Sequence, residues 1–231
     1  MRRSAALAVL AALASCARRA PRAARAPAAP GRPVRIVALG DSLAFGTGAS
    51  APRNAFIFQA YLRVRAQHPG SRIDTYAIGG STAADVLRLQ APRLAHARAG
   101  VVVICVGGND VVHRVAAADF ARTYAQLVAR VRALQPHAAI VCCGVPDVGL
   151  SPLFTGADHD AVARLSREND AAIRAVARRA GAEFVDLYAT TLRQHGDVNR
   201  FLSEDRFHPS DAGYVQLADA LAPALLRAAS R

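Results

Sequence analysis

The chain of 231 residues contains no lysine and no tryptophan, one methionine and four cysteines. No apolar run reaches the roughly 20 residues that a membrane-spanning helix needs, which excludes a polytopic membrane protein. Just over half of the residues are apolar (52%) and 20% are charged, so the chain can bury a core and is not globally disordered. Its length is enough for one α/β domain and short of two of ordinary size.

Because lysine is missing, the net charge of +12 comes entirely from arginine, and the arginines are unevenly placed. Seven of the 29 lie in the first 33 residues, which contain no acidic residue. From Val34 onward, 22 Arg stand against 17 acidic residues, a net charge of +5. A mildly basic body with a basic N-terminal arm argues against a nucleic-acid-binding protein. The Arg- and Ala-rich composition is typical of a GC-rich bacterial genome.

Residues 1–15 have the layout of a secretory signal peptide, in which Arg2 and Arg3 precede an apolar stretch and small residues. Its end, LASC, resembles a bacterial lipobox in which Cys16 is lipidated and becomes the mature N-terminus. Residues 16–33 are then a Pro-, Ala- and Arg-rich tether, where lipid and positive charge supply two membrane-binding signals. We expect an exported lipoprotein, anchored to a bacterial membrane and facing the periplasm or the cell exterior. The alternative is an ordinary cleaved signal peptide.

From residue 34 to residue 231, short apolar runs alternate with helical patterns. Runs without polar alternation are typical of strands buried on both faces of a parallel sheet. The spacing of apolar residues predicts helices over 118–134 and 160–177, and a last helix from about Asp211 that Pro223 should break or kink. Five βα units with right-handed crossovers predict one three-layer α/β/α domain with the flavodoxin-like strand order 2-1-3-4-5. The expected strands are 34–40, 72–78, 101–107, 138–144 and 182–187.

Cys105, Cys142 and Cys143 all lie in these apolar runs. Export would permit a disulfide. Their odd number, and the opposite directions of neighbouring side chains in a strand, nevertheless favour buried free thiols. No Cys or His spacing indicates a metal site, and His159 between two Asp residues is interpreted as an exposed helix start.

Three polar motifs follow the first three expected strands. GDSL (40–43) places a Ser directly after an expected strand. A Ser in such a turn is exposed beside backbone N–H groups, as a nucleophile must be. The same motif could instead be a helix cap. GGND (107–110) offers the side-chain amide of Asn109 as a fixed donor, or it could be a simple turn. GGST (79–82) offers glycine backbone that a substrate oxygen can approach, or it could be a capped helix entry.

A fourth motif, DRFHP (205–209), lies near the C-terminus. An Asp three residues before a His can accept the imidazole Nδ1–H and leave Nε2 free as a base. The chain has seven His, so this spacing carries little weight alone and gains it only beside the other three motifs.

In order and spacing, the four motifs resemble sequence blocks of the SGNH (GDSL-type) hydrolase family, and the resemblance covers the whole expected domain. It implies that Ser42 is the nucleophile, that His208 is the general base and then acid, and that Asp205 orients His208. It also implies an oxyanion hole formed by the N–H groups of Ser42 and Gly80 and the side-chain amide of Asn109. The second block lacks the Asn often found upstream of it. The family's chemistry needs no metal or organic cofactor.

The resemblance implies two-step acyl transfer, in which the Ser hydroxyl attacks an ester carbonyl and water then releases the acyl group. We therefore expect an esterase or lipase-like hydrolase that acts on a small-molecule, lipid or carbohydrate acyl ester. The same residues would serve a carbohydrate O-deacetylase, a thioesterase or a lysophospholipase, and a non-catalytic binding lipoprotein is the alternative from another class. The apolar segment 145–154 could line an acyl groove with Val111, Val112 and Phe207, or pack over the edge of the sheet.

Overall fold

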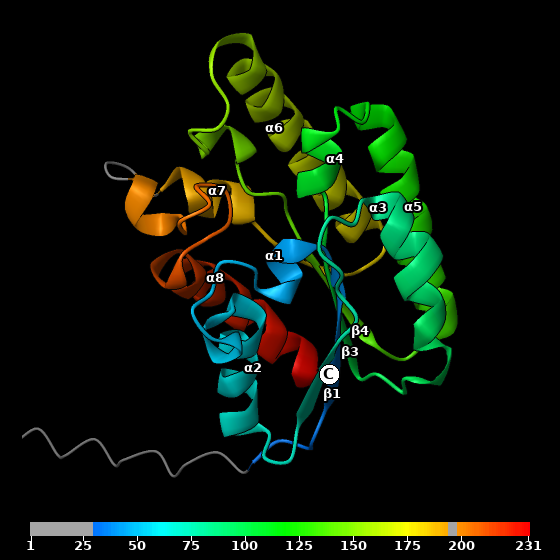
Figure 1. Cartoon of the computed structure of the whole chain (residues 1–231). Helices are drawn as coiled ribbons and strands as arrows, with labels where there is room; N and C mark the ends of the chain where they lie inside the picture. The colour runs from blue at the N-terminus through cyan, green and yellow to red at the C-terminus, as the bar shows by residue number, and fades with distance from the viewer. Residues whose placement is uncertain (1–29, 194–197) are drawn as a thin grey trace, which may run out of the picture.

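Five apolar segments pair into one parallel sheet in the computed structural model, which describes residues 30–193 and 198–231 (Figure 1). The strand order is β2-β1-β3-β4-β5. This confirms the predicted α/β fold with a flavodoxin-like five-stranded sheet, although the strands are shorter than the apolar runs. Cys16, the signal peptide and most of the tether lie outside the described residues. The strands are β1 (Arg35–Gly40), β2 (Arg72–Thr75), β3 (Val101–Cys105), β4 (Ala139–Cys143) and β5 (Glu183–Val185).

Helices cover both faces of the sheet, which gives three layers (Figure 1). Helices α2 (Phe56–Gln67) and α8 (Asp211–Ala229) pack on one face. Helices α5 (Ala117–Leu134) and α6 (Gly156–Arg179) pack on the other and confirm the two helices predicted from periodicity. The shorter helices are α1 (Ser42–Phe45), α3 (Ala83–Asp85), α4 (Gly108–Val112) and α7 (Leu187–Leu192).

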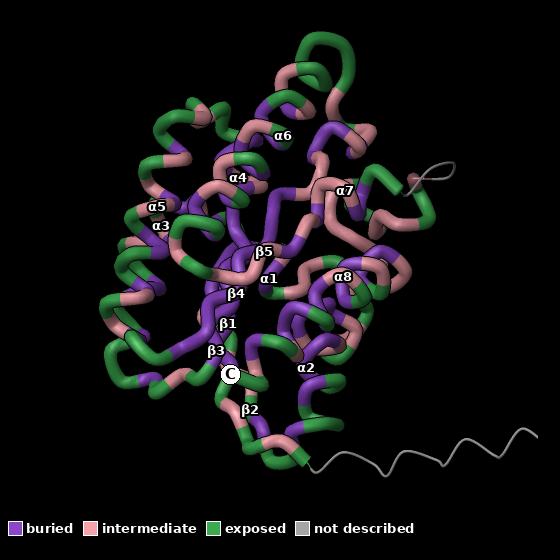
Figure 2. Tube along the Cα trace, turned by 180° about the vertical axis from the view of Figure 1, so that it is seen from behind, coloured by how far each residue is buried: buried purple, intermediate pink, exposed green. Residues whose placement is uncertain are grey.

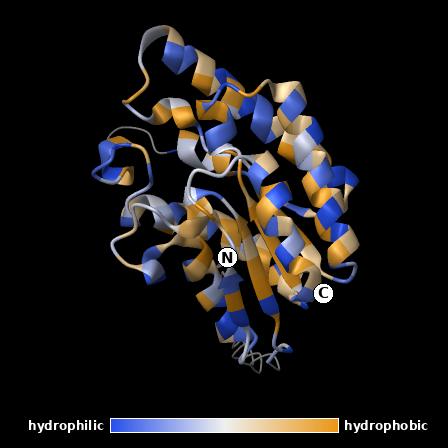
Figure 3. Ribbon diagram, turned by 45° about the vertical axis from the view of Figure 1, so that its right-hand side comes forward, coloured by the Kyte–Doolittle hydropathy of each residue, from blue (hydrophilic) through white to orange (hydrophobic). Residues whose placement is uncertain are grey.

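Successive residues of the central strands enter opposite cores. Ile36 and Ala38 of β1 pack with α2 and α8, whereas Val37 and Leu39 pack with α5 and α6. This follows from the alternation of side chains along a strand. Since both faces are covered, the central strands β3 and β4 are apolar and buried at every position, and so is β1 after Arg35 (Figures 2 and 3).

The three cysteines of the sheet are buried free thiols. Cys142 enters the core under α5 and α6, whereas its neighbour Cys143 enters the core under α2 and α8 together with Cys105. Burial raises the pKa of the Cys142 thiol to about 12. A thiol that stays protonated is a poor nucleophile, so Cys142 acts as a small core residue.

Helix α8 continues through Pro223, so of the two expected effects of this residue, a break or a kink, the break does not occur. The residues around the proline, Leu221, Ala222, Ala224 and Leu225, are all buried against the sheet and α2. Burial of this face offsets the backbone hydrogen bond that a proline cannot donate. Within residues 30–193 and 198–231, none of the helices is long and apolar enough to cross a membrane.

Candidate active site

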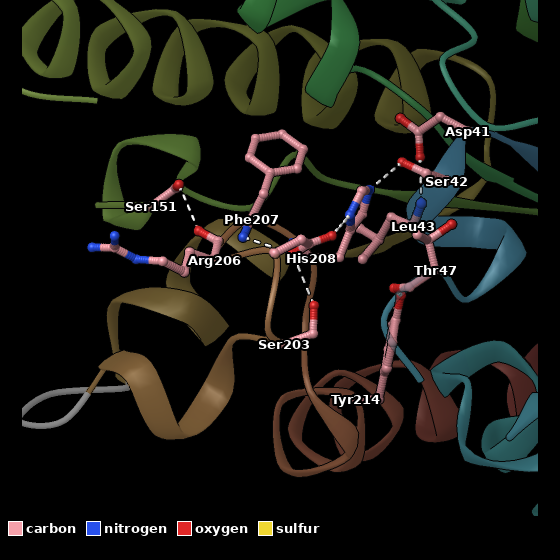
Figure 4. Close-up of polar contacts among 11 residues, drawn as sticks. Asp41, Ser42, Leu43, Thr47, Ser151, Ser203, Arg206, Phe207, His208 and Tyr214 are labelled. Atoms are coloured by element: carbon pink, nitrogen blue, oxygen red, sulfur yellow. Dashed lines mark hydrogen bonds and ion pairs between the residues drawn. The ribbon is translucent and has the colours of Figure 1, made fainter. Parts of the chain in front are cut away.

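Three of the four polar motifs meet at one edge of the sheet because parallel strands end on the same side. GDSL follows β1, GGST follows β2 and GGND follows β3. The fourth motif, DRFHP, lies in the loop that leads into α8, and that loop returns to the same edge (Figure 4).

Ser42 is the first residue of α1, and only Asp41 separates it from the end of β1. The carboxylate of Asp41 caps this helix by accepting the N–H of Leu43 at 3.0 Å. Gly40 has a φ of +152°, and a Cβ at this position would lie 1.9 Å from the carbonyl oxygen of Cys105. Only glycine therefore allows β1 to turn into α1 this close to β3.

His208 lies between Ser42 and Asp205 and is hydrogen-bonded to both; Figure 4 shows its ring beside Ser42. Its Nε2 is 2.8 Å from Ser42 Oγ, and its Nδ1 is 2.6 Å from Asp205 Oδ2. With the proton on Nδ1, the ring donates to the carboxylate and Nε2 accepts from the serine hydroxyl. The structure thus brings the three residues singled out from the GDSL and DRFHP motifs into one hydrogen-bonded line.

The second oxygen of Asp205 is held by three donors that the sequence analysis did not single out. Its Oδ1 accepts from Ser203 Oγ at 2.8 Å and from the N–H groups of Phe207 and His208, each at 2.9 Å. Burial raises the pKa of Asp205, but the hydrogen bonds from His208, the backbone and Ser203 together lower it more, so the net pKa is well below the usual carboxyl range. Asp205 is therefore a fixed negative charge behind the imidazole.

Contacts between α8 and the loop after α1 hold the histidine loop beside Ser42. The hydroxyl of Tyr214 donates to the carbonyl oxygen of Thr47 at 2.6 Å (Figure 4). Asp211 accepts from the N–H of Ser50 at 2.9 Å and also from its hydroxyl. The first and last motifs, about 165 positions apart in the chain, are joined by these bonds and not only by the Ser42–His208 contact.

The GGST and GGND motifs contact each other beside Ser42. Asn109, in α4, donates one side-chain N–H to the carbonyl oxygen of Ser81 at 3.0 Å, which leaves its second N–H for another acceptor. Gly80 has a φ of +79°, and a Cβ there would meet no atom within 4 Å, so its backbone faces open space. A Cβ at Gly79 would lie 3.9 Å from that of Ser42. The second motif thus approaches Ser42 through Gly79, and Asn109 of the third motif lines the same cavity as Ser42.

Two buried carboxylates support these loops. Burial raises the pKa of Asp41 to about 6, against the opposing effect of the Leu43 N–H. Burial also raises the pKa of Asp110, which accepts the N–H of Ala83 at 3.0 Å and so joins α4 to α3. Both side chains bond to backbone of the turns that carry the motifs.

A cavity opens from the serine towards the loop after β4. Ser42, Asn109 and His208 line it, whereas Gly80 lies outside it. Its apolar wall includes Val145, Pro146, Val148 and Leu150, so the segment 145–154 lines a groove, which was one of the two expected positions for it. Val111 does not contribute, because it is fully buried in the core under α5 and α6. The far walls come from α8, the end of β3 and the segment before α8, through Leu217, Cys105, Val198, Phe201 and Leu202.

Comparison with known proteins agrees with this geometry. The GDSL-like Lipase/Acylhydrolase family matches residues 38–216. Among solved structures, TesA is similar with 22% identity and a TM-score of 0.67, over 83% of this chain and 97% of its own. The psychrotrophic esterase EstA from Pseudoalteromonas sp. has 16% identity and a TM-score of 0.65, over 84% and 97%. An acetylxylan esterase from Geobacillus stearothermophilus has 20% identity and a TM-score of 0.65, over 87% and 96%. No curated protein sequence matches the chain.

At these identities the likeness to solved structures shows a shared fold, and the family match carries the assignment. That match covers well over half of the chain and includes all four motifs that suggested the SGNH (GDSL-type) resemblance. The chain therefore belongs to the GDSL-like lipase/acylhydrolase family and is an ester-bond hydrolase.

Proposed function

We propose that this hydrolase cleaves carboxylic esters through a Ser-His-Asp acyl-enzyme mechanism. The observation that carries the proposal is the hydrogen-bonded line from Ser42 Oγ through the imidazole of His208 to Asp205. In the first step His208 Nε2 accepts the hydroxyl proton as Ser42 Oγ attacks the ester carbonyl. The alcohol leaves with that proton, and a water molecule then releases the acyl group by the same steps in reverse.

The negative charge that develops on the carbonyl oxygen needs fixed donors. We assign this role to the N–H groups of Ser42 and Gly80 and to the free side-chain N–H of Asn109. In support, Gly80 backbone is open to solvent and Asn109 lines the cavity together with Ser42. Losing one such donor typically lowers kcat by about 10²- to 10³-fold.

We further propose that the cavity beside Ser42 takes a short to medium acyl chain. The cavity has a volume of about 90 Å³, and apolar side chains such as Val148, Leu150 and Leu217 line much of it. An apolar wall beside the nucleophile favours burial of an acyl chain. We expect acyl groups of about four to six carbons to bury most of their apolar surface here, and a chain of about twelve carbons to leave part of it in water.

Hydrolysis of p-nitrophenyl esters from acetate to palmitate tests the function and the chain length together. We expect kcat/KM to peak near butyrate or hexanoate and to fall at least about tenfold for laurate, because the longer chain must leave apolar surface in water. Wild-type protein that neither hydrolyses these esters nor reacts with a fluorophosphonate would contradict the proposed function. A flat profile would contradict only the role of the cavity.

Leu217→Ala extends the cavity at its far wall and should move the optimum to longer acyl chains. Leu221→Ala is the matched control, since Leu221 is equally buried one turn further along α8 but does not line the cavity. Both changes should destabilise the fold by about 2–5 kcal/mol. An optimum that moves in both variants, or in neither, would contradict the assignment of the far wall.

We also propose that Cys16 is lipidated and anchors the enzyme to a bacterial membrane, with residues 16–33 as the tether. The support is the LASC motif after an apolar stretch and the five arginines of the tether. Cys16→Ser should move the protein from the detergent phase to the aqueous phase, because one lipid chain or charge alone binds weakly. Specific activity should not change. An unmodified mature N-terminus in mass spectra would contradict the lipoprotein proposal and leave the enzyme proposal intact.

A further inference from the structure

Gln90 is a fully buried polar side chain. In the folded protein it lies between the GDSL and GGST motifs and is bonded to both. It ends the π-helical turn Val86–Gln90 that follows α3. Pro92, two residues later, has no N–H to continue an α-helical ladder, and a 3₁₀ helix begins at Ala91. Turns of π type are frequent at functional sites. The sequence offers no periodic or motif signal for this glutamine.

The amide of Gln90 supplies the acceptor for the last N–H of β1. The segment after β2 continues beside β1 and donates the N–H of Ile78 to the carbonyl oxygen of Gly40 at 3.1 Å, whereas the N–H of Gly40 bonds to the side chain of Gln90. Gln90 Oε1 accepts that N–H at 2.8 Å, and Gln90 Nε2 donates to the carbonyl oxygen of the same glycine at 2.8 Å. Each bond is possible in only one orientation of the amide, because only the oxygen accepts and only the nitrogen donates.

The same amide reaches the second motif and, through it, the third. Gln90 Nε2 also lies 3.2 Å from Ser81 Oγ, to which it donates. The carbonyl oxygen of Ser81 in turn accepts the side-chain N–H of Asn109. The side chain of Gln90 is therefore bonded to Gly40, two positions before Ser42, and to Ser81, which follows Gly80. Through Ser81 it is linked to Asn109.

We propose that Gln90 is a positioning residue for the oxyanion hole, a role that rests on the proposed ester hydrolysis. Its amide keeps the N–H groups of Ser42 and Gly80 and the amide of Asn109 aimed at one point. These donors come from three different loops, and a misplacement of about 1 Å can cost on the order of 100-fold in rate. Gln90 touches no substrate atom, so its loss should lower kcat with little change in KM.

Gln135 provides a matched control within the same chain. It is also a buried glutamine whose amide bonds two backbone groups, accepting the N–H of Ala99 at 2.9 Å and donating to the carbonyl oxygen of Leu94. These groups precede β3 and lie at the opposite edge of the sheet from Ser42. Replacement of either glutamine by methionine removes a similar set of hydrogen bonds at nearly constant side-chain length.

Steady-state kinetics on p-nitrophenyl butyrate and the rate of fluorophosphonate labelling distinguish the two sites. We expect Gln90→Met to lower kcat and the labelling rate by about 10- to 100-fold, with KM within about twofold of wild type. Gln135→Met should keep the wild-type kcat, and its melting temperature should fall by about as much as that of Gln90→Met. Equal kcat values for the two variants, with active wild type, would overturn the role of Gln90 and leave the proposed function standing. Wild type inactive towards both reagents would instead overturn the proposed function.

Gln90→Glu keeps the inference testable if the methionine variant does not fold. A protonated glutamic acid can accept from Gly40 N–H and donate to its carbonyl oxygen, whereas an ionised one cannot donate. Burial raises the pKa of a carboxyl group, so the switch should fall within the assay range. We expect kcat of Gln90→Glu to fall as the pH rises, while kcat of wild type and of Gln135→Glu does not fall over the same range. A Gln90→Glu profile that parallels wild type would overturn the proposal.

Discussion

Ser42→Ala is expected to lower kcat on p-nitrophenyl esters by at least about 10⁴-fold, because loss of a serine nucleophile in this type of site costs up to about 10⁶-fold. Labelling by a fluorophosphonate should vanish as well. The hydroxyl contacts His208 and lines the cavity, so it has no packing role in the core. The melting temperature should therefore stay close to that of wild type.

Ser71→Ala is the control for this experiment. Ser71 lies just before β2, at the other edge of the sheet, where its hydroxyl accepts the N–H of Val34 and donates to the carbonyl oxygen of His68. This variant should lose stability and keep its kcat per folded molecule. If Ser42→Ala retained wild-type turnover, or if labelling persisted on another residue, Ser42 would not be the nucleophile.

Asp205→Asn is the second change with a large expected effect, and we expect kcat to fall by about 10⁴-fold. A neutral amide can donate to Nδ1 of His208, which would place the ring proton on Nε2. In that tautomer Nε2 cannot accept the proton of Ser42. In wild type, the ionisation of Asp205 should not change kcat above about pH 5, since hydrogen bonds hold its pKa well below the usual carboxyl range.

The same pKa shift predicts the sign of the stability change. A carboxyl whose pKa is lower in the folded protein stabilises the fold above its unfolded value, and this stabilisation is lost as the pH falls towards the folded value. Asp205→Asn should therefore destabilise the protein at neutral pH and progressively less in acid. Asp219→Asn, which removes a surface ion pair with Arg63, is the control and should change neither kcat nor its pH dependence. An active Asp205→Asn variant would assign the orientation of His208 to another group.

The sequence by itself determined the layers of the fold and the residues of the candidate site. Strands covered on both faces must be apolar at every position, so runs such as VVVIC are visible without any knowledge of their partners. The chemistry of the site is also local in sequence. Serine after a strand end and aspartate three residues before histidine are short patterns that are ambiguous alone, and they indicate a site because four such motifs occur together in one chain.

Three features depend on contacts between distant segments and are visible only in the tertiary structure: the cavity, the continuity of α8 and the bonds of Gln90. The cavity beside Ser42 is built from the loop after β4, the loop before α8 and α8 itself, and no short pattern states that these surfaces enclose a space. Helix α8 continues through Pro223 because the residues on both sides of the proline are buried. Helix propensity describes single residues and does not include this stabilisation by packing. Gln90 bonds to Gly40 across 50 positions of the chain. Hydrogen bonds between residues so far apart in the sequence depend on how the helices and strands pack against one another. Short sequence patterns carry no information about that packing.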